Sequence, residues 1–342
     1  MVSPLFEWLP SEWPRWLVIA GIALLVADAW RRIALRRGVL DVPGHRSSHV
    51  VATPRGAGVG IAVALGLAIA LWAPRGEGGA AVLLGGLVVA LVGFVDDLRP
   101  LRASTKFAGQ ALAALPVAIA LPLTPEGLPF AIPAALSVVA GMAVVLLFVN
   151  AWNFMDGIDG IATLAAMAVC AAVLGASAGA GAGLVVCVAL SVLAACAGFL
   201  PLNFPKARAF MGDCGSHVLG FALASLVLAA PRVEIALVAM VASSAFLVDV
   251  LGTLVLRALD GEPLASAHRR HLYQLVTRSG YSHGRVTMVY GAWMLVSGGG
   301  MAVADSAGWS TIVATGFVGA TTLAWWLLTR HFTRRLKERG TW

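Results

Sequence analysis

Residues 140–160 read AGMAVVLLFVNAWNFMDGIDG, a hydrophobic run that ends in four polar side chains spaced three residues apart. The amides are Asn150 and Asn153, and the carboxylates are Asp156 and Asp159. Four such groups at the end of a membrane-length apolar segment are costly to desolvate, so they indicate a functional site. The plain structural alternative is a loop with a capping Asn and an Asp-Gly turn, the usual explanation for an isolated Asp-Gly pair.

The composition around this stretch predicts that the whole chain lies in a membrane. Of its 342 residues, 59% are hydrophobic and only 12% are charged, whereas soluble domains average about 25% charged residues. We therefore predict an all-α polytopic membrane protein, with residues 1–342 forming a single integral membrane domain. The apolar runs are continuous rather than alternating, which argues against a β-barrel.

The apolar runs are long enough to cross a bilayer as helices, and we count eleven of them. The fourth contains Gln110 and Pro116, so ten spans are the alternative. The predicted spans are about 14–30, 57–73, 79–95, 107–122, 132–149, 160–176, 182–200, 215–230, 233–256, 286–304 and 309–329. The abundant small residues of these spans allow close helix packing and are compatible with a homodimer.

The distribution of positive charge predicts how the spans are oriented. Of the 24 Lys and Arg residues, all but Arg15, Arg75 and Arg232 fall in loops on one side or in the C-terminal tail. The positive-inside rule makes that side cytoplasmic, with the N-terminus in the periplasm and the C-terminus in the cytoplasm. Because the basic residues are scattered between spans, we interpret the net charge of +7 as a topology signal and expect no nucleic-acid partner.

Nearly all chemically capable residues lie in the predicted cytoplasmic loops. The active site is therefore expected to form from loops at about 31–56, 96–107, 150–160, 201–216 and 257–285. The first contains Arg46, His49 and Arg55, which would bind anions. The alternative is a basic loop held close to anionic lipid headgroups.

The second loop begins where Asp96 and Asp97 end an apolar span, and Lys106 follows them. Adjacent carboxylates repel each other, so a divalent ion or nearby basic residues are needed to keep both ionised. The structural alternative is an interfacial cap with salt bridges, which are common and weak.

The last two loops add a further acid and a basic cluster. Asp213 lies among glycines at a predicted helix start, where backbone N–H groups and a carboxylate would meet. The segment SAHRRHLYQL contains His268, Arg269 and His271, and it lacks the partners of a zinc site. Five acids and two amides on one face are hard oxygen ligands that suit magnesium, with manganese as the alternative, and the basic rim suits a phosphorylated substrate.

These motifs occur together in one known family. GFVDDL, NAWNFMDGIDG, FMGDCGS and HRRHLYQ resemble, in order and spacing, the motifs of the polyprenyl-phosphate N-acetylhexosamine-1-phosphate transferases, glycosyltransferase family 4. The resemblance extends over nearly the whole chain. It implies a multi-pass enzyme of the bacterial inner membrane that transfers a sugar phosphate from a UDP-N-acetylsugar to undecaprenyl phosphate and releases UMP.

The resemblance also implies roles for individual residues. Asp213 matches the principal magnesium ligand, with Asn153 as its partner. The acids that it makes catalytic are Asp96, Asp97, Asp156 and Asp159. For substrate binding, the resemblance implies Lys106 and His271. The polar and basic character of the loops adds Asn150, Arg46, His49, Arg55, His268 and Arg269, although Asn150 could instead only orient its neighbours.

The last motif departs from the family pattern, because Tyr273 and Gln274 stand where many members have His-His. This form resembles the subgroup that starts O-antigen chains with modified N-acetylsugars. The acceptor phosphate is largely ionised at neutral pH, with a second pKa near ~6, so Asp96 need not be a strong base. We expect direct attack, stabilised by positioning and charge neutralisation, with an aspartyl intermediate as the alternative.

Two other functions fit parts of the pattern. A transporter would need an ion site within the spans, where only Asp28 and Asp249 are candidates. A CDP-alcohol phosphotransferase would need a DGxxAR motif, and the segment DGIDGIA has no Arg.

Overall fold

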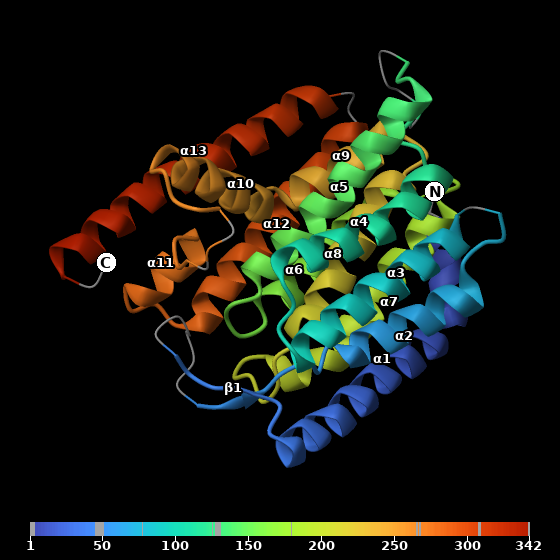
Figure 1. Cartoon of the computed structure of the whole chain (residues 1–342). Helices are drawn as coiled ribbons and strands as arrows, with labels where there is room; N and C mark the ends of the chain where they lie inside the picture. Colours follow the sequence, from blue (N-terminus) through green and yellow to red (C-terminus); the bar gives the residue numbers. More distant parts are fainter. Residues whose placement is uncertain are drawn as a thin grey trace.

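Helices make up almost all of the structure, a computed structural model that describes residues 4–44, 51–76, 78–124, 126, 131–178, 180–264, 266, 268–306 and 309–340. Figure 1 shows the helices side by side in one bundle, with α13 at its edge. Within the described residues the first seven helices are α1 (Pro4–Arg37), α2 (Val59–Trp72), α3 (Gly79–Leu98), α4 (Ala103–Ala120), α5 (Ala134–Met155), α6 (Ile161–Ala176) and α7 (Gly183–Asn203). The remaining helices are α8 (Gly212–Leu228), α9 (Val233–Ala242), α10 (Ser244–Leu259), α11 (Leu272–Arg278), α12 (His283–Ser306) and α13 (Ser310–Glu338).

The helices agree with the predicted all-α class and with the positions of the predicted spans. Every span except the ninth coincides with one helix, and α4 forms despite Gln110 and Pro116. The ninth span, 233–256, is wrong as a single rod, because α9 and α10 meet at Ser243 with a bend of 64°. Among the described residues, five helices are long and apolar enough to cross a membrane, or six with the bent pair, and α2, α6 and α8 are shorter apolar helices.

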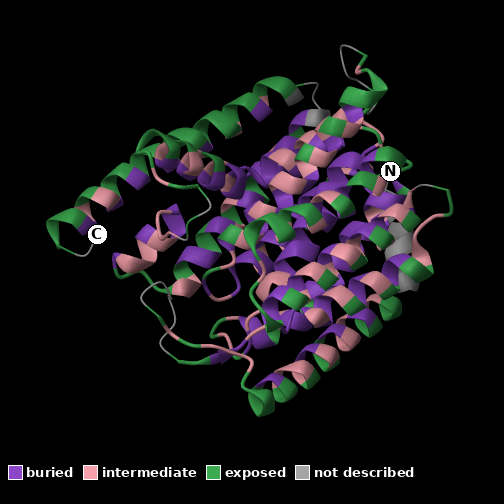
Figure 2. Cartoon of the chain, viewed as in Figure 1, coloured by how far each residue is buried: buried purple, intermediate pink, exposed green. Residues whose placement is uncertain are grey.

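The core lies where α8 packs between α3 and α5, with α7 behind it. Figure 2 shows this centre as buried and α13 as largely exposed. Small residues permit the close approach: a Cβ at Gly220 of α8 would lie 2.5 Å from the carbonyl oxygen of Phe148 in α5. Helices in a membrane gain most from such close contact, since lipid tails are as apolar as their side chains.

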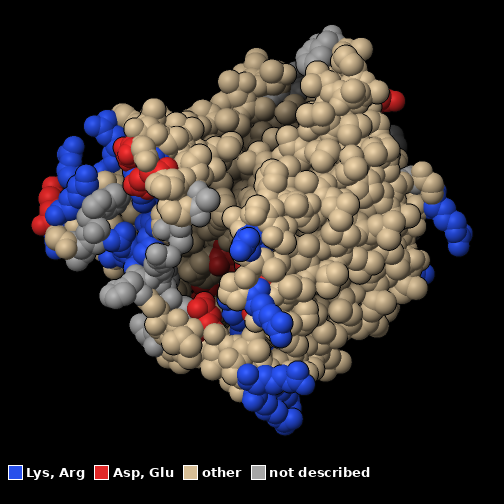
Figure 3. Space-filling view, in the orientation of Figure 1, with Lys and Arg blue, Asp and Glu red and all other residues tan. Residues whose placement is uncertain are grey.

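One end of the bundle gathers the predicted active-site loops, and we call it the basic end. A short antiparallel pair, β1 (Leu40–Asp41) with β2 (Thr53–Pro54), lies there. The chain after β2 then runs beside the start of α8, because the backbone N–H of Ala57 donates to the carbonyl of Phe210 at 3.0 Å. In Figure 3 carboxylates lie in a hollow at this end, and Lys and Arg side chains surround it.

Candidate active site

Asp97 joins three separate segments at the start of α8. Its carboxylate accepts hydrogen bonds from the backbone N–H groups of Asp213 and Cys214, at 3.0 and 3.1 Å. It also forms an ion pair of 2.9 Å with the guanidinium of Arg55, while its own side chain is fully buried. The first-turn N–H groups of a helix have no partner within the helix, so a carboxylate there is well stabilised. Asp97 thus fixes the position of Asp213 rather than facing the hollow.

Asp96, although adjacent in sequence, has different partners. It accepts a hydrogen bond from the backbone N–H of Leu101 at 2.6 Å and one from Lys106 Nζ at 3.3 Å. The same ammonium group lies 3.1 Å from Asp213 Oδ2. Lys106 therefore bridges Asp96 and Asp213, which come from α3 and α8, and it offsets the repulsion between their charges.

Two cavities meet at Asn153. The first, the aspartate cavity, has a volume of about 180 Å³. Its polar lining comes from Asp41, Arg55, Asn153, Asn203, Asp156, Asp213 and Ser216. The second, the histidine cavity, has a volume of about 620 Å³. Its polar lining comes from Ser104, Lys106, Gln110, Asn150, Asn153, His217, Ser266, His268, His271 and Gln274.

The acids of the NAWNFMDGIDG stretch separate in space. Asp156 lines the aspartate cavity, where burial, with the charges of Asp213 and Asp97, raises its pKa to about 8. Asp159 lines neither cavity: its carboxylate lies 3.4 Å from Nδ1 of His283, at the start of α12. Both acids lie in the loop between the end of α5 at Met155 and the start of α6 at Ile161. The backbone carbonyl of Asp159 accepts a hydrogen bond of 2.8 Å from Thr287 Oγ1 in α12, which holds the second acid beside that helix.

The predicted substrate-binding residues are also divided by the fold. Arg55 lines the aspartate cavity, and Lys106, Asn150, His268 and His271 line the histidine cavity. Arg269 lines neither of them. The predictions for Arg46 and His49 lie outside the described residues.

A network that the sequence analysis did not assign to the site connects Asn150 to Asp213. Asn150 donates to Gln110 at 2.8 Å, Gln110 lies 3.4 Å from His217 Nε2, and the same nitrogen is 3.9 Å from Asp213 Oδ2. The signal for Gln110 was present, since it is a polar residue in the middle of an apolar span. His217 follows Asp213 by one helical turn, so the two face the same way.

Asp249 organises the loop that carries the two histidines. Its buried carboxylate accepts hydrogen bonds from the backbone N–H of Leu272 at 3.0 Å, from Tyr290 Oη at 3.1 Å and from Trp325 Nε1 at 3.1 Å. The carboxylate is also 3.5 Å from His271 Nδ1. It therefore ties α10 to α11, α12 and α13. These donors saturate Asp249, so it is a structural acid and not an ion site of a transporter.

The two histidines of the histidine cavity, His268 and His271, differ in their surroundings. Burial, together with the neighbouring His271, lowers the pKa of His268 to about 4. His268 is consequently neutral at neutral pH and can donate or accept a hydrogen bond there. His271 is 3% exposed, and its ring stacks on the rings of Phe154 and Tyr273, which restrict its orientation.

The residues around Asp213 fit a magnesium ion that also binds substrate. No cluster of three His, Cys, Asp or Glu side chains at metal-ligand spacing occurs in the described part of the chain. Magnesium commonly relies on one or two carboxylates, with water and substrate phosphates completing its shell. Asp213 and Asn153 can supply that share, and Lys106 shows that this position already holds a positive charge between two carboxylates.

Comparison with known proteins identifies one family whose matching segment contains much of the candidate site. Residues 80–230 match the profile of Glycosyl transferase family 4, a segment that includes Asp96, Asp97, the NAWNFMDGIDG stretch and Asp213. The chain is 33% identical over 317 residues to a decaprenyl-phosphate N-acetylglucosaminephosphotransferase of Mycobacterium tuberculosis, covering 81% of this chain and 78% of that protein.

Two further relatives differ in what their names say they act on. A probable undecaprenyl-phosphate N-acetylglucosaminyl 1-phosphate transferase of Bacillus subtilis is 27% identical over 278 residues, covering 76% of this chain and 75% of the relative. A phospho-N-acetylmuramoyl-pentapeptide-transferase of Granulibacter bethesdensis is 34% identical over 241 residues, covering 59% of this chain and 65% of the relative.

Proposed function

This chain belongs to glycosyltransferase family 4, the polyprenyl-phosphate N-acetylhexosamine-1-phosphate transferases, and we propose that it transfers an N-acetylsugar 1-phosphate from a UDP-sugar to undecaprenyl phosphate. UMP is released, and the product is a lipid-linked sugar diphosphate that starts a cell-envelope polysaccharide such as O-antigen. The observation that carries this proposal is the meeting of two polar cavities at Asn153, beside Asp213 and Lys106.

We propose that the two cavities bind the two substrates on either side of one reacting centre. In the proposed arrangement the nucleotide diphosphate occupies the aspartate cavity, where Phe210 offers an aromatic face and Asn203 a polar group. The sugar and the acceptor phosphate occupy the larger histidine cavity. Lys106 lies between them, where its charge can stabilise phosphate oxygens of both substrates.

The proposed reaction is direct attack of an acceptor phosphate oxygen on the sugar-linked phosphorus. One P–O bond forms as the bond to the UMP oxygen breaks, and the leaving group departs as a phosphate anion that needs no proton. Magnesium, when bound by Asp213 and Asn153, would neutralise charge on the diphosphate. Lys106 positions the phosphates, Asp96 holds Lys106, and Asp97 holds the start of α8, so positioning and charge account for the acceleration.

The cavity lining favours sugar selection by the segment 257–285. His268, His271 and Gln274 line the histidine cavity from this segment. Tyr273 donates instead to the carbonyl of Phe154 at 3.1 Å, which places the segment against the end of α5. We propose a modified N-acetylsugar as the preferred donor, in line with the Tyr-Gln ending of the last motif.

The test is UMP release by the purified protein with undecaprenyl phosphate, magnesium and a panel of UDP-N-acetylsugars. Asp213→Asn is expected to lower turnover at least about 100-fold, because it removes a charge at the reacting centre. Glu234→Gln, which removes a carboxylate at the start of α9 outside both cavities, is the matched control and keeps its activity. The proposal would be overturned if none of the UDP-N-acetylsugars in the panel gave UMP. Full activity of Asp213→Asn would remove the metal assignment.

A further inference from the structure

A third charged cavity, separate from both active-site cavities, lies between α10 and α13. We call it the basic cavity, and its volume is about 400 Å³. The residues that matter for its chemistry are Arg270, Thr329, Arg330, Arg334, Lys337 and Glu338. In Figure 3 basic side chains gather over the C-terminal part of α13, at the edge of the molecule.

The charge of the basic cavity is positive. Arg270 is paired with Asp260 and Glu262, at 2.6 and 2.7 Å, and these acids fix its guanidinium in the cavity wall. Within the described part of the chain, Arg330 and Arg334 have no carboxylate at ion-pair distance. Glu338 is the one acid that lines the cavity. The excess of guanidinium and ammonium groups therefore favours a bound anion, and planar guanidinium groups suit phosphate.

A buried hydroxyl in the same cavity lacks a partner. Thr329 is 7% exposed, and its Oγ1 is buried with no hydrogen-bond partner among the described residues. Two other threonines of α13, Thr321 and Thr322, donate to the backbone carbonyls one turn earlier, at 2.7 and 2.8 Å. A buried hydroxyl without a partner is costly. Thr329 lines the basic cavity, so a change of its side-chain rotamer would turn Oγ1 toward an acceptor oxygen of a ligand there.

The surroundings identify the anion as a lipid phosphate. Along α13, Leu323 and Leu327 are 57% and 52% exposed, as expected of side chains that face lipid tails. Trp326, one turn after Leu323, is 43% exposed, and the guanidinium of Arg330 lies 4.7 Å from its ring centre. Exposed tryptophans collect at the boundary between hydrocarbon and headgroups. The basic cavity therefore lies at the depth of lipid phosphates.

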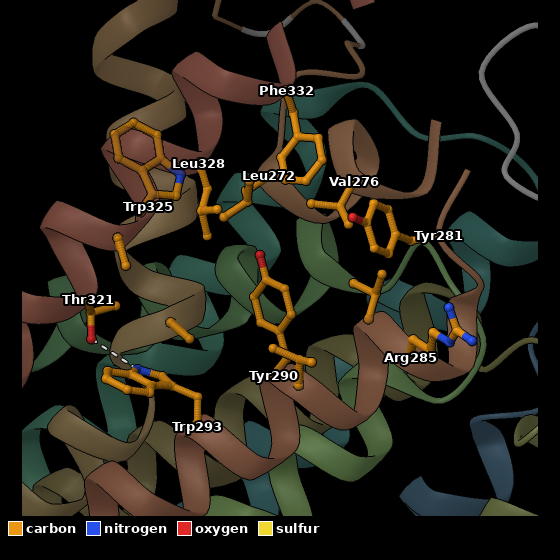
Figure 4. A pocket seen from close by; sticks show the side chains of 14 residues that line it. Leu272, Val276, Tyr281, Arg285, Tyr290, Trp293, Thr321, Trp325, Leu328 and Phe332 are labelled. Atoms are coloured by element: carbon orange, nitrogen blue, oxygen red, sulfur yellow. Dashed lines mark hydrogen bonds between the residues drawn. The ribbon is translucent and has the colours of Figure 1, made fainter. Parts of the chain in front are cut away.

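A neighbouring cavity on a different face of α13 shows the contrast. It has a volume of about 380 Å³ and lies against Trp325, Leu328 and Phe332. Figure 4 shows these side chains around an almost wholly apolar space, with Arg285 at one side. This apolar cavity has no cluster of basic side chains to bind a phosphate. Of the two cavities beside α13, the basic cavity is therefore the one that favours an anionic ligand over a neutral one.

We propose that the basic cavity binds the phosphate of an anionic phospholipid from the leaflet at the basic end. Arg330, Arg334 and Lys337 hold the phosphate, and Thr329 donates a hydrogen bond to it. Arg270 is next to His271, which lines the histidine cavity, so the lipid borders the loop that faces the sugar. This site goes beyond the transferase reaction, and it would exist whether or not that reaction is the correct one.

The experiment uses the full chain in nanodiscs of equal parts phosphatidylcholine and phosphatidylglycerol, with retained lipid measured by native mass spectrometry. The wild type is expected to retain phosphatidylglycerol in preference to phosphatidylcholine. Each basic residue near an anionic headgroup contributes roughly fivefold in affinity, so Arg330→Gln/Arg334→Gln should bind about 25-fold more weakly. Thr329→Val, similar in shape, should weaken binding about tenfold, because it loses a hydrogen bond to a charged group.

The matched control is Arg335→Gln/Arg339→Gln, which removes the same charge from the last turn of α13 and from its C-cap without touching the cavity lining. It is expected to retain phosphatidylglycerol like the wild type. Equal loss in both double variants would overturn the proposal in favour of a diffuse attraction between α13 and the membrane surface. Inorganic phosphate that displaces the bound phosphatidylglycerol at millimolar concentration would overturn the lipid assignment.

Discussion

At the scale of single residues, the adjacent carboxylates Asp96 and Asp97 perform different tasks. Successive side chains on a helix point about 100° apart, so the two acids at the end of α3 face different neighbours. Asp97 is enclosed by Arg55 and the start of α8, whereas Asp96 holds Lys106 at the histidine cavity. Asp96 and Lys106 therefore lie where the substrates would react, whereas Asp97 holds Asp213 in position.

The first prediction concerns the structural role of Asp97. Asp97→Ala should lower the free energy of unfolding by about 3 kcal/mol, because it leaves the Arg55 charge and two N–H groups without a partner. The control is Asp28→Ala in α1, which also breaks arginine pairs, at 2.7 and 2.8 Å, but in a more exposed position. It should cost less than about 1 kcal/mol. Thermal unfolding in detergent compares them, and equal shifts in melting temperature would contradict the positioning role.

A second prediction follows from the raised pKa of Asp156. Below about pH 8 this carboxyl holds a proton in the free protein, and a cation bound in the aspartate cavity must displace it. The apparent magnesium affinity should therefore rise by up to tenfold per pH unit between pH ~6 and ~8, and level off above that. Magnesium titrations at several pH values measure it. Asp156→Asn should flatten the dependence, and an unchanged slope in that variant would exclude Asp156 as its source.

At the scale of elements, the contact between α3 and α8 determines whether Asp213 reaches the site. A Cβ at Gly93 would lie 2.4 Å from the carbonyl oxygen of Asp213 and 2.6 Å from the backbone nitrogen of Cys214. Both are backbone atoms, which cannot rotate away as a side chain can. The absence of a side chain at Gly93 is thus what lets the end of α3 meet the start of α8.

The third prediction tests this contact with two glycines of the same helix. Gly93→Ala should push the start of α8 away and lower turnover at least tenfold, since small displacements near reacting groups are costly in rate. Gly86→Ala is the control, because its new Cβ would lie 3.9 Å from Phe221, an ordinary contact. That change should leave activity intact and stabilise α3 slightly, by about 0.5–1 kcal/mol. Equal activities of the two variants would contradict the close approach.

The loop with the two histidines is an element-scale feature of a different kind. Asp249 lies in α10, on the C-terminal side of the bend that breaks the ninth predicted span. From there its carboxylate reaches α11, α12 and α13 at once. The bend and the buried Asp249 together place His271 against the histidine cavity. Both Asp249 and His271 are far from the NAWNFMDGIDG stretch in sequence.

At the scale of the whole molecule, the site lies at one end of the bundle and the opposite loops contain little chemistry. All described titratable residues of the two active-site cavities come from the basic end. The positive-inside rule predicts that this end faces the cytoplasm. We propose the same orientation, with the N-terminus in the periplasm and the C-terminus in the cytoplasm.

The fourth prediction tests the orientation by cysteine labelling in membrane vesicles. The four native cysteines are buried, so the wild type should react little with a membrane-impermeant maleimide. Arg75→Cys and Arg99→Cys place an exposed thiol at opposite ends of α3. Arg75→Cys should label only in right-side-out vesicles and Arg99→Cys only in inside-out vesicles. The reverse pattern would invert the topology.

The sequence alone was enough to predict the helical membrane architecture, the gathering of acids at one end and the family. These properties follow from hydrophobic runs, charge placement and short motifs, which are local along the chain. The sequence did not predict which polar side chains contact one another. It grouped Asp159 with the site acids, and the structure sets it against His283; it left out Gln110 and His217, which the structure brings to the site.

Only the tertiary structure decided which polar groups face one another. A carboxylate's role depends on the donors around it and on its exposure, and those donors come from helices far apart in sequence. Asp97 is structural because Arg55 and the start of α8 enclose it, and Asp249 is structural because α11, α12 and α13 converge on it. The NAWNFMDGIDG stretch likewise contributes Asn153 and Asp156 to the cavities and Asp159 elsewhere, because α5 ends at Met155 and the loop that follows carries Asp159 to α12.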